Sequence, residues 1–223
     1  LQAIILWLVS DWRPSLEYNL QTAKEMFNFS KWVLFSALLS WFFAWGDTFI
    51  LGFFFSSHEL GLYRTGNYFI SAIFGLITTP LIPVMYSYFS KIQDNKDRVR
   101  DTLLMSSKTV SFFILPAGTF LFIMQTQISD IIFGDKWTGI ASVIGLLSLQ
   151  QAISWIIGLN TTAFSAIGKP DIESKINFIA IWYYLATYLI FAQISFKAFL
   201  IARLILTMCT IFLHIFFSKK HLS

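Results

Sequence analysis

Residues 45–69 have the sequence WGDTFILGFFFSSHELGLYRTGNYF, and this stretch decides the fold. It places an acidic residue, Asp47, inside an apolar run that is long enough to cross a bilayer. A turn that contains Gly61 follows, and apolar sequence then resumes with Arg64 and Asn67 near its start. A carboxylate in hydrocarbon is costly and is usually kept for a function, so Asp47 marks a candidate functional site.

The composition of the whole chain is that of a membrane protein. Of the 223 residues, 56% are hydrophobic and 18% are aromatic, whereas only 13% are charged. Average soluble domains carry about 25% charged residues. The apolar runs are long and unbroken, which favours spanning helices over a membrane β-barrel with its short alternating strands. The predicted fold class is therefore all-α, a polytopic membrane helical bundle.

Six full membrane spans are predicted between residues 32 and 217, and together they form a six-helix transmembrane lobe. They cover about residues 32–55, 62–86, 109–128, 139–163, 176–195 and 198–217. Each segment is close to the roughly 20 residues that a tilted spanning helix needs. The last two are joined almost directly, so we expect them to form a tight helical hairpin.

The sequence before residue 32 predicts two further segments. Residues 1–10 form about half of an apolar span, and we interpret them as the end of a truncated one. Residues 11–31 predict a cytoplasmic amphipathic linker helix on the membrane surface, with a solvated linker helix as the alternative. Its apolar positions share one helical face; they are Leu16, Leu20, Ala23 and Phe27.

The basic residues predict the orientation in the membrane. Twelve of the 16 Lys and Arg residues fall in loops or tails on one side of the predicted spans, and three fall on the other. The positive-inside rule then places residues 11–31, the basic loop 91–108 and the tail 218–223 in the cytoplasm. Topology accounts for the net charge of +4, so no nucleic-acid partner is predicted.

The chain has no motif that indicates an enzyme, a cofactor or a metal site. The single cysteine, Cys209, excludes a disulfide framework and a cysteine-based metal cluster. The three histidines do not share a helical face with a carboxylate at metal-ligand spacing. A phosphate-binding Gly-Lys-Ser/Thr loop and a Gly-x-Ser-x-Gly nucleophile elbow are both absent from the sequence.

Four of the predicted spans carry polar residues along one helical face. These faces are Ser36, Ser40 and Asp47; Arg64, Asn67, Ser71, Gly75 and Thr78; Gln151, Ser154, Gly158, Thr161 and Ser165; and Arg203, Thr207, Thr210 and His214. Small and hydroxyl residues also let membrane helices pack closely, so packing explains many of these positions. The charged residues favour a water-filled cavity, because a charge in the membrane needs water or a partner.

An ordered set of short motifs extends over nearly all of the chain. It comprises Phe29-Ser30-Lys31, Asp47-Thr48-Phe49-Ile50-Leu51-Gly52, Leu60-Gly61-Leu62-Tyr63, Pro80, Pro83, Phe89-Ser90, Leu115-Pro116, Ile131-Ile132-Phe133-Gly134-Asp135-Lys136-Trp137 and Ala166-Ile167-Gly168-Lys169-Pro170. Each motif is weak alone, and their order and spacing carry the specificity. With them the chain resembles the C-terminal half of the polysaccharide flippases, the Wzx-type branch of the MOP exporter superfamily.

This resemblance implies half of a two-lobed transporter in a bacterial plasma (inner) membrane. Its expected substrate is an undecaprenyl-pyrophosphate-linked oligosaccharide, moved from the cytoplasmic to the periplasmic leaflet for O-antigen, exopolysaccharide or teichuronic-acid synthesis. The expected mechanism is alternating access coupled to a proton or a sodium ion, without ATP hydrolysis. Membrane lipids and a polymerase complex are the other expected partners.

The resemblance also suggests roles for the polar residues of the spans. Arginines suit a pyrophosphate head group, and hydroxyl and amide groups suit sugars. Two roles are open for Asp47, namely carrying a coupling proton or pairing with an arginine, of which Arg64 lies just across the short periplasmic turn. The candidate substrate-binding residues are Asp47, Arg64, Asn67, Gln151, Thr161 and Arg203.

Other functions remain open at this stage. A related antiporter of the multidrug-extrusion type would share the helical architecture. A non-transporting membrane subunit of a polysaccharide assembly complex, or a membrane-embedded transferase, would not need a cavity. Convergence of the polar faces on one cavity would favour a transporter over these alternatives.

Overall fold

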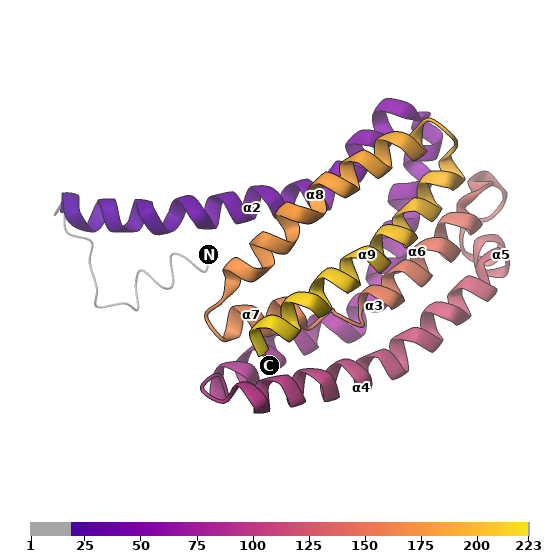
Figure 1. The fold of residues 1–223 in the computed structure, drawn as a ribbon. Helices are drawn as coiled ribbons and strands as arrows, with labels where there is room; N and C mark the ends of the chain where they lie inside the picture. The colour runs from indigo at the N-terminus through magenta and orange to yellow at the C-terminus, as the bar shows by residue number, and fades with distance from the viewer. Residues whose placement is uncertain (1–18, 223) are drawn as a thin grey trace, which may run out of the picture. The chain divides into compact units, whose positions relative to one another are not determined.

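The computed structural model describes residues 19–222, all of whose regular elements are helices (Figure 1). They are α2 (Leu20–Phe54), α3 (Ser57–Lys91), α4 (Lys96–Ile123), α5 (Gln125–Ile128), the π-helix η1 (Ser129–Phe133), the 3-10 helix η2 (Asp135–Trp137), α6 (Ile140–Ser154), α7 (Asn160–Ala166), α8 (Pro170–Ala192) and α9 (Phe196–Leu222). The predicted all-α class is confirmed. The chain divides into two compact units, Leu1–Leu38 and Leu39–Ser223, which we describe separately.

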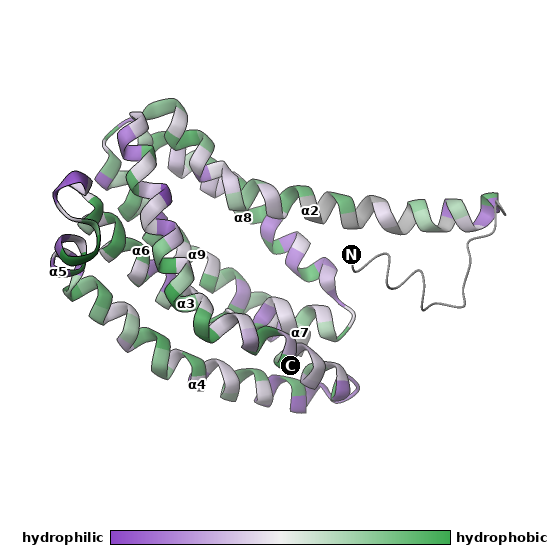
Figure 2. Ribbon diagram, turned by 180° about the vertical axis from the view of Figure 1, so that it is seen from behind, coloured by the Kyte–Doolittle hydropathy of each residue, from purple (hydrophilic) through white to green (hydrophobic). Residues whose placement is uncertain are grey.

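Within residues 19–222, four helices are long and apolar enough to cross a membrane, namely α3, α4, α8 and residues Phe196–Lys220 of α9. Two shorter apolar helical stretches, Leu38–Phe54 and Ile140–Ser154, accompany them. Figure 2 shows hydrophobic residues along most of α4, α6 and α9. Every one of the six predicted spans therefore corresponds to an apolar helix or pair of helices, while the number that cross the membrane stays a prediction.

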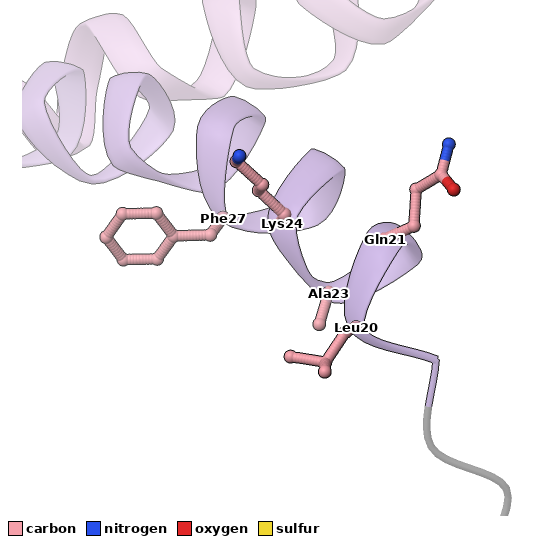
Figure 3. Close-up of a pocket in the computed structure, with 5 residues that line it drawn as sticks. All are labelled: Leu20, Gln21, Ala23, Lys24 and Phe27. Carbon is pink, nitrogen blue, oxygen red and sulfur yellow. The ribbon is translucent and has the colours of Figure 1, made fainter.

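The first unit is described only from residue 19 onward, so the predicted end of a truncated span and the start of the linker lie outside the described residues. From Leu20 the chain is helical, and α2 continues through the predicted linker into the predicted first span. In the first two turns Leu20, Ala23 and Phe27 lie toward one side of the helix and Gln21 extends to the other (Figure 3). That this segment is an amphipathic helix on the cytoplasmic membrane surface stays a prediction.

In the second unit, the helix starts are fixed by side chains that satisfy free backbone groups. At the start of α3, Ser56 Oγ accepts from the Glu59 N–H at 3.3 Å, and Glu59 Oε2 accepts from the Ser56 N–H at 3.0 Å. This reciprocal capping box lets α3 begin directly after the two-residue turn that ends α2. At the start of α4, Asn95 Oδ1 accepts from the Arg98 N–H at 3.0 Å.

The core of the second unit forms around α6. This helix packs against α3, α4 and α9, and α8 pairs with α9 (Figure 1). The helices α4 and α6 approach each other closely at Gly118, because a Cβ there would lie 2.4 Å from Ala152 Cβ. The Ser148 hydroxyl also donates to the Gly118 carbonyl at 3.2 Å, so the interface combines a small residue with an interhelical hydrogen bond.

The fourth predicted span, about residues 139–163, is interrupted in the structure. The helix α6 ends at Ser154, and α7 begins at Asn160 after a series of tight turns. At Gly158 a Cβ would lie 2.4 Å from the Trp155 ring, so the indole occupies the space of the missing side chain. The prediction of one continuous helix was therefore wrong here, because apolar character alone does not register this turn.

Candidate functional site

A buried ion pair joins the C-terminal half of α2 to α9. Arg203 Nη1 donates to Asp47 Oδ2 at 2.5 Å, and the side chains of Arg203 and Asp47 are only 17% and 7% exposed. The two residues are 156 positions apart in sequence. The pair therefore fixes α2 against α9, within a core that is mostly apolar.

A tyrosine hydroxyl forms a hydrogen bond to the same carboxylate. The Tyr63 hydroxyl, from α3, donates to Asp47 Oδ2, and Tyr63 is almost fully buried. The Arg203 guanidinium also lies over the Tyr63 ring, 5.3 Å from its centroid. A buried tyrosine needs a hydrogen-bond partner for its hydroxyl, and here Asp47 provides it. Three helices, α2, α3 and α9, thus meet at one carboxylate.

The second arginine reaches Asp47 indirectly, through Thr48. Arg64 Nη1 donates to Thr48 Oγ1 at 3.3 Å, while the Thr48 hydroxyl and backbone N–H donate to Asp47 Oδ1 at 3.1 and 2.6 Å. The Arg64 guanidinium also stacks over the rings of Trp45 and Tyr68, 4.3 and 4.9 Å from their centroids. The arginine that pairs directly with Asp47 is therefore Arg203 rather than Arg64.

This cluster carries an excess of positive charge. It holds one carboxylate and two guanidinium groups, so with all three ionised its formal charge is +1. Arg203 is already paired with Asp47. Arg64 is partly exposed and is held by hydroxyl groups and aromatic rings instead. Arginine guanidinium groups are suited to bidentate binding of phosphate. The cluster can therefore attract an anion through Arg64 without first breaking the buried pair.

A small cavity adjoins the carboxylate. It has a volume of about 20 Å³, and its lining is mostly aromatic and aliphatic, with polar groups from Asp47, Tyr184 and Tyr188. The cavity is bounded by α2 and α8, so α8 becomes the fourth helix at this site. Its size suits a single small ligand such as one water molecule rather than a sugar.

The remaining predicted site residues lie apart from the ion pair. Asn67 is half-buried one turn beyond Arg64 on α3, and Gln151 is half-buried near the end of α6. Thr161 is exposed on α7, where it helps to line a separate open groove of about 460 Å³ together with α3 residues around Pro83. The interruption between α6 and α7 places Gln151 and Thr161 on different helices. The structure thus brings Asp47, Arg64 and Arg203 together, and leaves the other three outside that cluster.

The places of Tyr63, Thr48 and the tyrosines of α8 in this site were not predicted from the sequence. The sequence gives only a weak indication that Tyr63 belongs to the site. It directly precedes Arg64, and only a short turn separates its helix from the helix of Asp47. The contribution of α8 had no such indication, because Tyr184 is more than 130 residues from Asp47 and lies in an apolar run. Among the described residues, His, Cys, Asp and Glu form no group of three or more that could hold a metal.

Comparison with known proteins places the chain in a family. A family model described as "Polysaccharide biosynthesis protein" matches residues 1–142, which include Asp47, Tyr63 and Arg64. The chain belongs to this polysaccharide biosynthesis family. The match extends over more than half of the chain and covers the motifs on which the resemblance to polysaccharide flippases was based, except the last one at residues 166–170. No solved structure matches the chain.

The chain is similar to several curated relatives, at low identity but over most of its own length. It is 24% identical over 186 residues, 79% of its length, to the "Probable low-salt glycan biosynthesis flippase Agl15" of Haloferax volcanii. It is 24% identical over 77% of its length to the "Teichuronic acid biosynthesis protein TuaB" of Bacillus subtilis. It is 21% identical over 82% of its length to the "Lipopolysaccharide biosynthesis protein WzxC" of Escherichia coli.

The chain spans little more than a third of the length of these relatives, namely 38%, 36% and 37%. Their names concern the synthesis of three different glycans, and one of them states a flippase activity. None of these names describes a catalysed reaction, which agrees with the expectation that the chain is not an enzyme. This family member is thus a multi-pass membrane protein of polysaccharide biosynthesis, and the charged cluster is its candidate site.

Proposed function

We propose that this chain is the C-terminal half of a flippase that moves undecaprenyl-pyrophosphate-linked oligosaccharides from the cytoplasmic to the periplasmic leaflet. The observation that carries the proposal is a buried carboxylate with two arginines beside it, Arg203 in direct contact and Arg64 through Thr48, which leaves an excess positive charge inside a mostly apolar helical unit. Charged residues within membrane-spanning segments face substrate or ion pathways, because elsewhere their cost is not offset. Membership of the polysaccharide biosynthesis family supports a glycan-linked anion as the substrate.

The proposed mechanism uses Asp47 as an internal substitute for the pyrophosphate. In the paired state the carboxylate holds Arg203 and keeps α2, α3 and α9 together. Arg64 contacts the arriving diphosphate first, since among the described residues it is held by hydroxyl groups and no carboxylate binds it directly. When the diphosphate takes Arg203 from Asp47, the contact between α2 and α9 is released, and the two helices become free to separate. Ion-coupled alternating access then returns the pair to its closed state.

The sugars of the substrate need hydroxyl and amide partners in addition to the charged cluster. In this proposal Asn67 lies nearest to the cluster, one turn from Arg64 on α3, and Gln151 and Thr161 contact the oligosaccharide at other levels of the membrane. Thr161 lines a groove rich in hydroxyl groups, which supports this assignment. The acceptor lipids and a polymerase complex are the partners that the proposed function requires.

The test uses the full-length protein in cells whose surface glycan depends on it. We expect Arg203→Ala and Arg64→Ala to abolish or strongly reduce surface polysaccharide and to accumulate lipid-linked precursor in the cytoplasmic leaflet. Arg203→Lys retains the charge but not the bidentate geometry, so export should be partly retained. Arg100→Ala, an exposed arginine of α4, is the matched control and should export normally.

Protein amount in the membrane must be measured for every variant, because a buried pair also contributes to stability. Normal surface polysaccharide in both Arg64→Ala and Arg203→Ala, at wild-type protein levels, would contradict the proposed role of the cluster. Loss of polysaccharide without accumulation of precursor in the cytoplasmic leaflet would instead favour a structural subunit of an assembly complex. The leaflet of the precursor therefore separates the two functions.

A further inference from the structure

A line of polar side chains extends along α9 from the ion pair toward the opposite end of the helix. Its members share one helical face at spacings of four, three, four and four residues; they are Arg203, Thr207, Thr210, His214 and Ser218. At 1.5 Å per residue the line is roughly 22 Å long, which is most of the thickness of a bilayer core. Thr207 and His214 are only 3% and 5% exposed, so the line lies inside the second unit.

Hydroxyl groups from α8 join this line in its middle. The hydroxyls of Tyr183 and Tyr184 lie 2.9 and 3.2 Å from Thr210 Oγ1. Thr210 has a single hydroxyl hydrogen and donates it to the Leu206 carbonyl at 2.9 Å, so both tyrosines donate to Thr210. Tyr184 also interacts with the side chain of Thr207, one turn closer to the ion pair.

The cavity beside Asp47 connects these hydroxyls to the carboxylate. Tyr184 and Asp47 both line it, and its volume of about 20 Å³ is enough for one water molecule. A water there has polar partners on both sides, from a phenol and from a carboxylate. The sequence of groups from Thr210 through Tyr184 to Asp47 is therefore continuous for hydrogen bonding once a single water is bound.

His214 lies one turn from Thr210 on the other side. Its Nδ1 has no hydrogen-bond partner in the structure, although the side chain is buried. Ser218, one turn further, accepts a hydrogen bond from Asn160 Nδ2 at 2.9 Å, near the basic end of the unit. A buried nitrogen without a partner is costly, so packing alone gives no reason to place a histidine here.

The surroundings of His214 contain few other titratable groups. The helix α6, which packs against α9, contains none. On α8 the nearest are Tyr183 and Tyr184 at the level of Thr210, with Glu173 toward the basic end. The charged residues of α4 all fall within its first thirteen positions, and on α9 itself Arg203 and Lys219 lie at the two ends of the line. His214 is therefore the one side chain in the central part of this line that carries a basic nitrogen.

We propose that this line is a proton route that connects the basic end of α9 to Asp47. His214 takes up a proton at Nδ1, which has no partner in this structure, and a rotation of the ring brings it to the Thr210 hydroxyl one turn away. The hydroxyls of Thr210, Tyr184 and Thr207, with one water in the cavity, then pass a proton to the carboxylate. Each hydroxyl accepts one proton and releases its own, so only N–H and O–H bonds form and break. His214 returns to its neutral form, and Asp47 becomes a neutral carboxylic acid. The inference rests on the proposed flippase function and identifies its coupling ion as a proton.

Protonation of Asp47 has a direct consequence for the ion pair. A neutral carboxylic acid no longer attracts the Arg203 guanidinium as an opposite charge, so Arg203 becomes available for the diphosphate. Departure of the diphosphate restores the pair when Asp47 releases the proton. In this way a proton gradient biases the opening and closing of the contact between α2 and α9.

The first experiment measures coupling in proteoliposomes that contain the full-length protein and a pH-sensitive dye in the lumen. The probe is the host cell's own undecaprenyl-pyrophosphate glycan, added with and without a pH gradient. For the wild type we expect the gradient to accelerate flipping and the glycan to trigger proton movement. In His214→Asn, and in Thr210→Val as a second variant, flipping without a gradient should persist, while its acceleration and the proton movement are lost. Cys209→Ala, an exposed neighbour on α9, should behave as the wild type does.

Gradient-accelerated flipping in both His214→Asn and Thr210→Val would overturn the proton route and leave the flippase function intact. If the wild type moves no glycan under any gradient, the proposed function itself fails. The route is then decided by a second measurement, exchange of the His214 ring N–H in D₂O, followed by ¹⁵N NMR and assigned by its absence in His214→Asn. Exchange that is fast and slowed in Thr210→Val supports the route, whereas protection like that of buried backbone amides overturns it.

Discussion

Two kinds of ion pair in the second unit invite comparison. The pair of Asp47 and Arg203 is buried, with 7% and 17% of the side-chain surfaces exposed, and it joins two helices that are distant in sequence. The pairs that Arg100 forms with Asp97 and Asp101 lie at the opposite end of the bundle, on one exposed turn of α4. Asp97 is 78% exposed and Arg100 is 41% exposed. The chemical groups are the same, and only burial and sequence separation differ.

This difference in burial decides how much stability is lost when one partner of a pair is removed. An exposed pair replaces water with a partner of similar strength and contributes little. A buried pair has already lost its water, so removing one partner leaves the other charged and unsolvated. Charged residues are rare inside apolar spans and usually mark functional positions, which supports the proposed role of Asp47 and Arg203.

The largest effect is expected for single substitutions within the buried pair. Asp47→Asn or Arg203→Met should lower the free energy of unfolding by about 3–5 kcal/mol, because each leaves an unpaired group in an apolar core. Unfolding of the full-length protein in mixed micelles, titrated with SDS, measures this change. The double variant Asp47→Asn/Arg203→Met should recover part of the loss, since it leaves no uncompensated charge. Additive losses in the double variant would show that the two residues are not coupled.

The next largest effect is expected for Tyr63→Phe. This substitution tests the contribution of the hydroxyl group while both charged residues stay in place. Tyr63→Phe removes only the hydrogen bond to Asp47 and keeps the ring that Arg203 covers. We expect a loss of about 1–2 kcal/mol in the same unfolding titration, as for other interhelical hydrogen bonds in membranes. Tyr68→Phe, whose hydroxyl is exposed and contacts Arg64, is the matched control and should change less. Equal effects in the two variants would mean that burial does not decide the contribution.

The sequence predicted the helical architecture well because apolar runs and basic loops are local features. It also identified Asp47, Arg64 and Arg203, since a charge in an apolar run is visible without any structure. It did not predict which arginine binds Asp47, because Arg64 is near in sequence whereas Arg203 is brought there by the packing of α9. The contribution of Tyr184 could not be predicted either. Its role depends on the pairing of α8 with α9 and on a cavity that exists only between packed helices.

A third prediction tests whether burial, rather than closeness to the site, sets the size of an effect. Ser56 lies in the turn between α2 and α3, near the ion pair in sequence, but it is exposed. Ser56→Ala removes the two hydrogen bonds of the Ser56 hydroxyl, which donates to Glu59 Oε2 and accepts from the Glu59 N–H, and it should cost about 1 kcal/mol in the unfolding titration. Ser57→Ala, at the next position and without a capping role, is the control. Glycan export should remain normal in both variants, and a loss of export in Ser56→Ala alone would show that this turn takes part in transport.

The smallest effect is expected for the exposed pairs of α4. Arg100→Ala removes contacts to Asp97 and Asp101, both at 3.2 Å, yet these groups are solvated before and after the change. We expect a loss of at most about 0.5 kcal/mol, and it should vanish at high ionic strength because salt screens exposed charges. The buried pair should keep its contribution in the same salt, since ions do not reach it. Repeating the unfolding titrations of Arg100→Ala and Asp47→Asn at low and high salt measures both values. A salt-insensitive loss in Arg100→Ala as large as that of Asp47→Asn would contradict the distinction between the two regions.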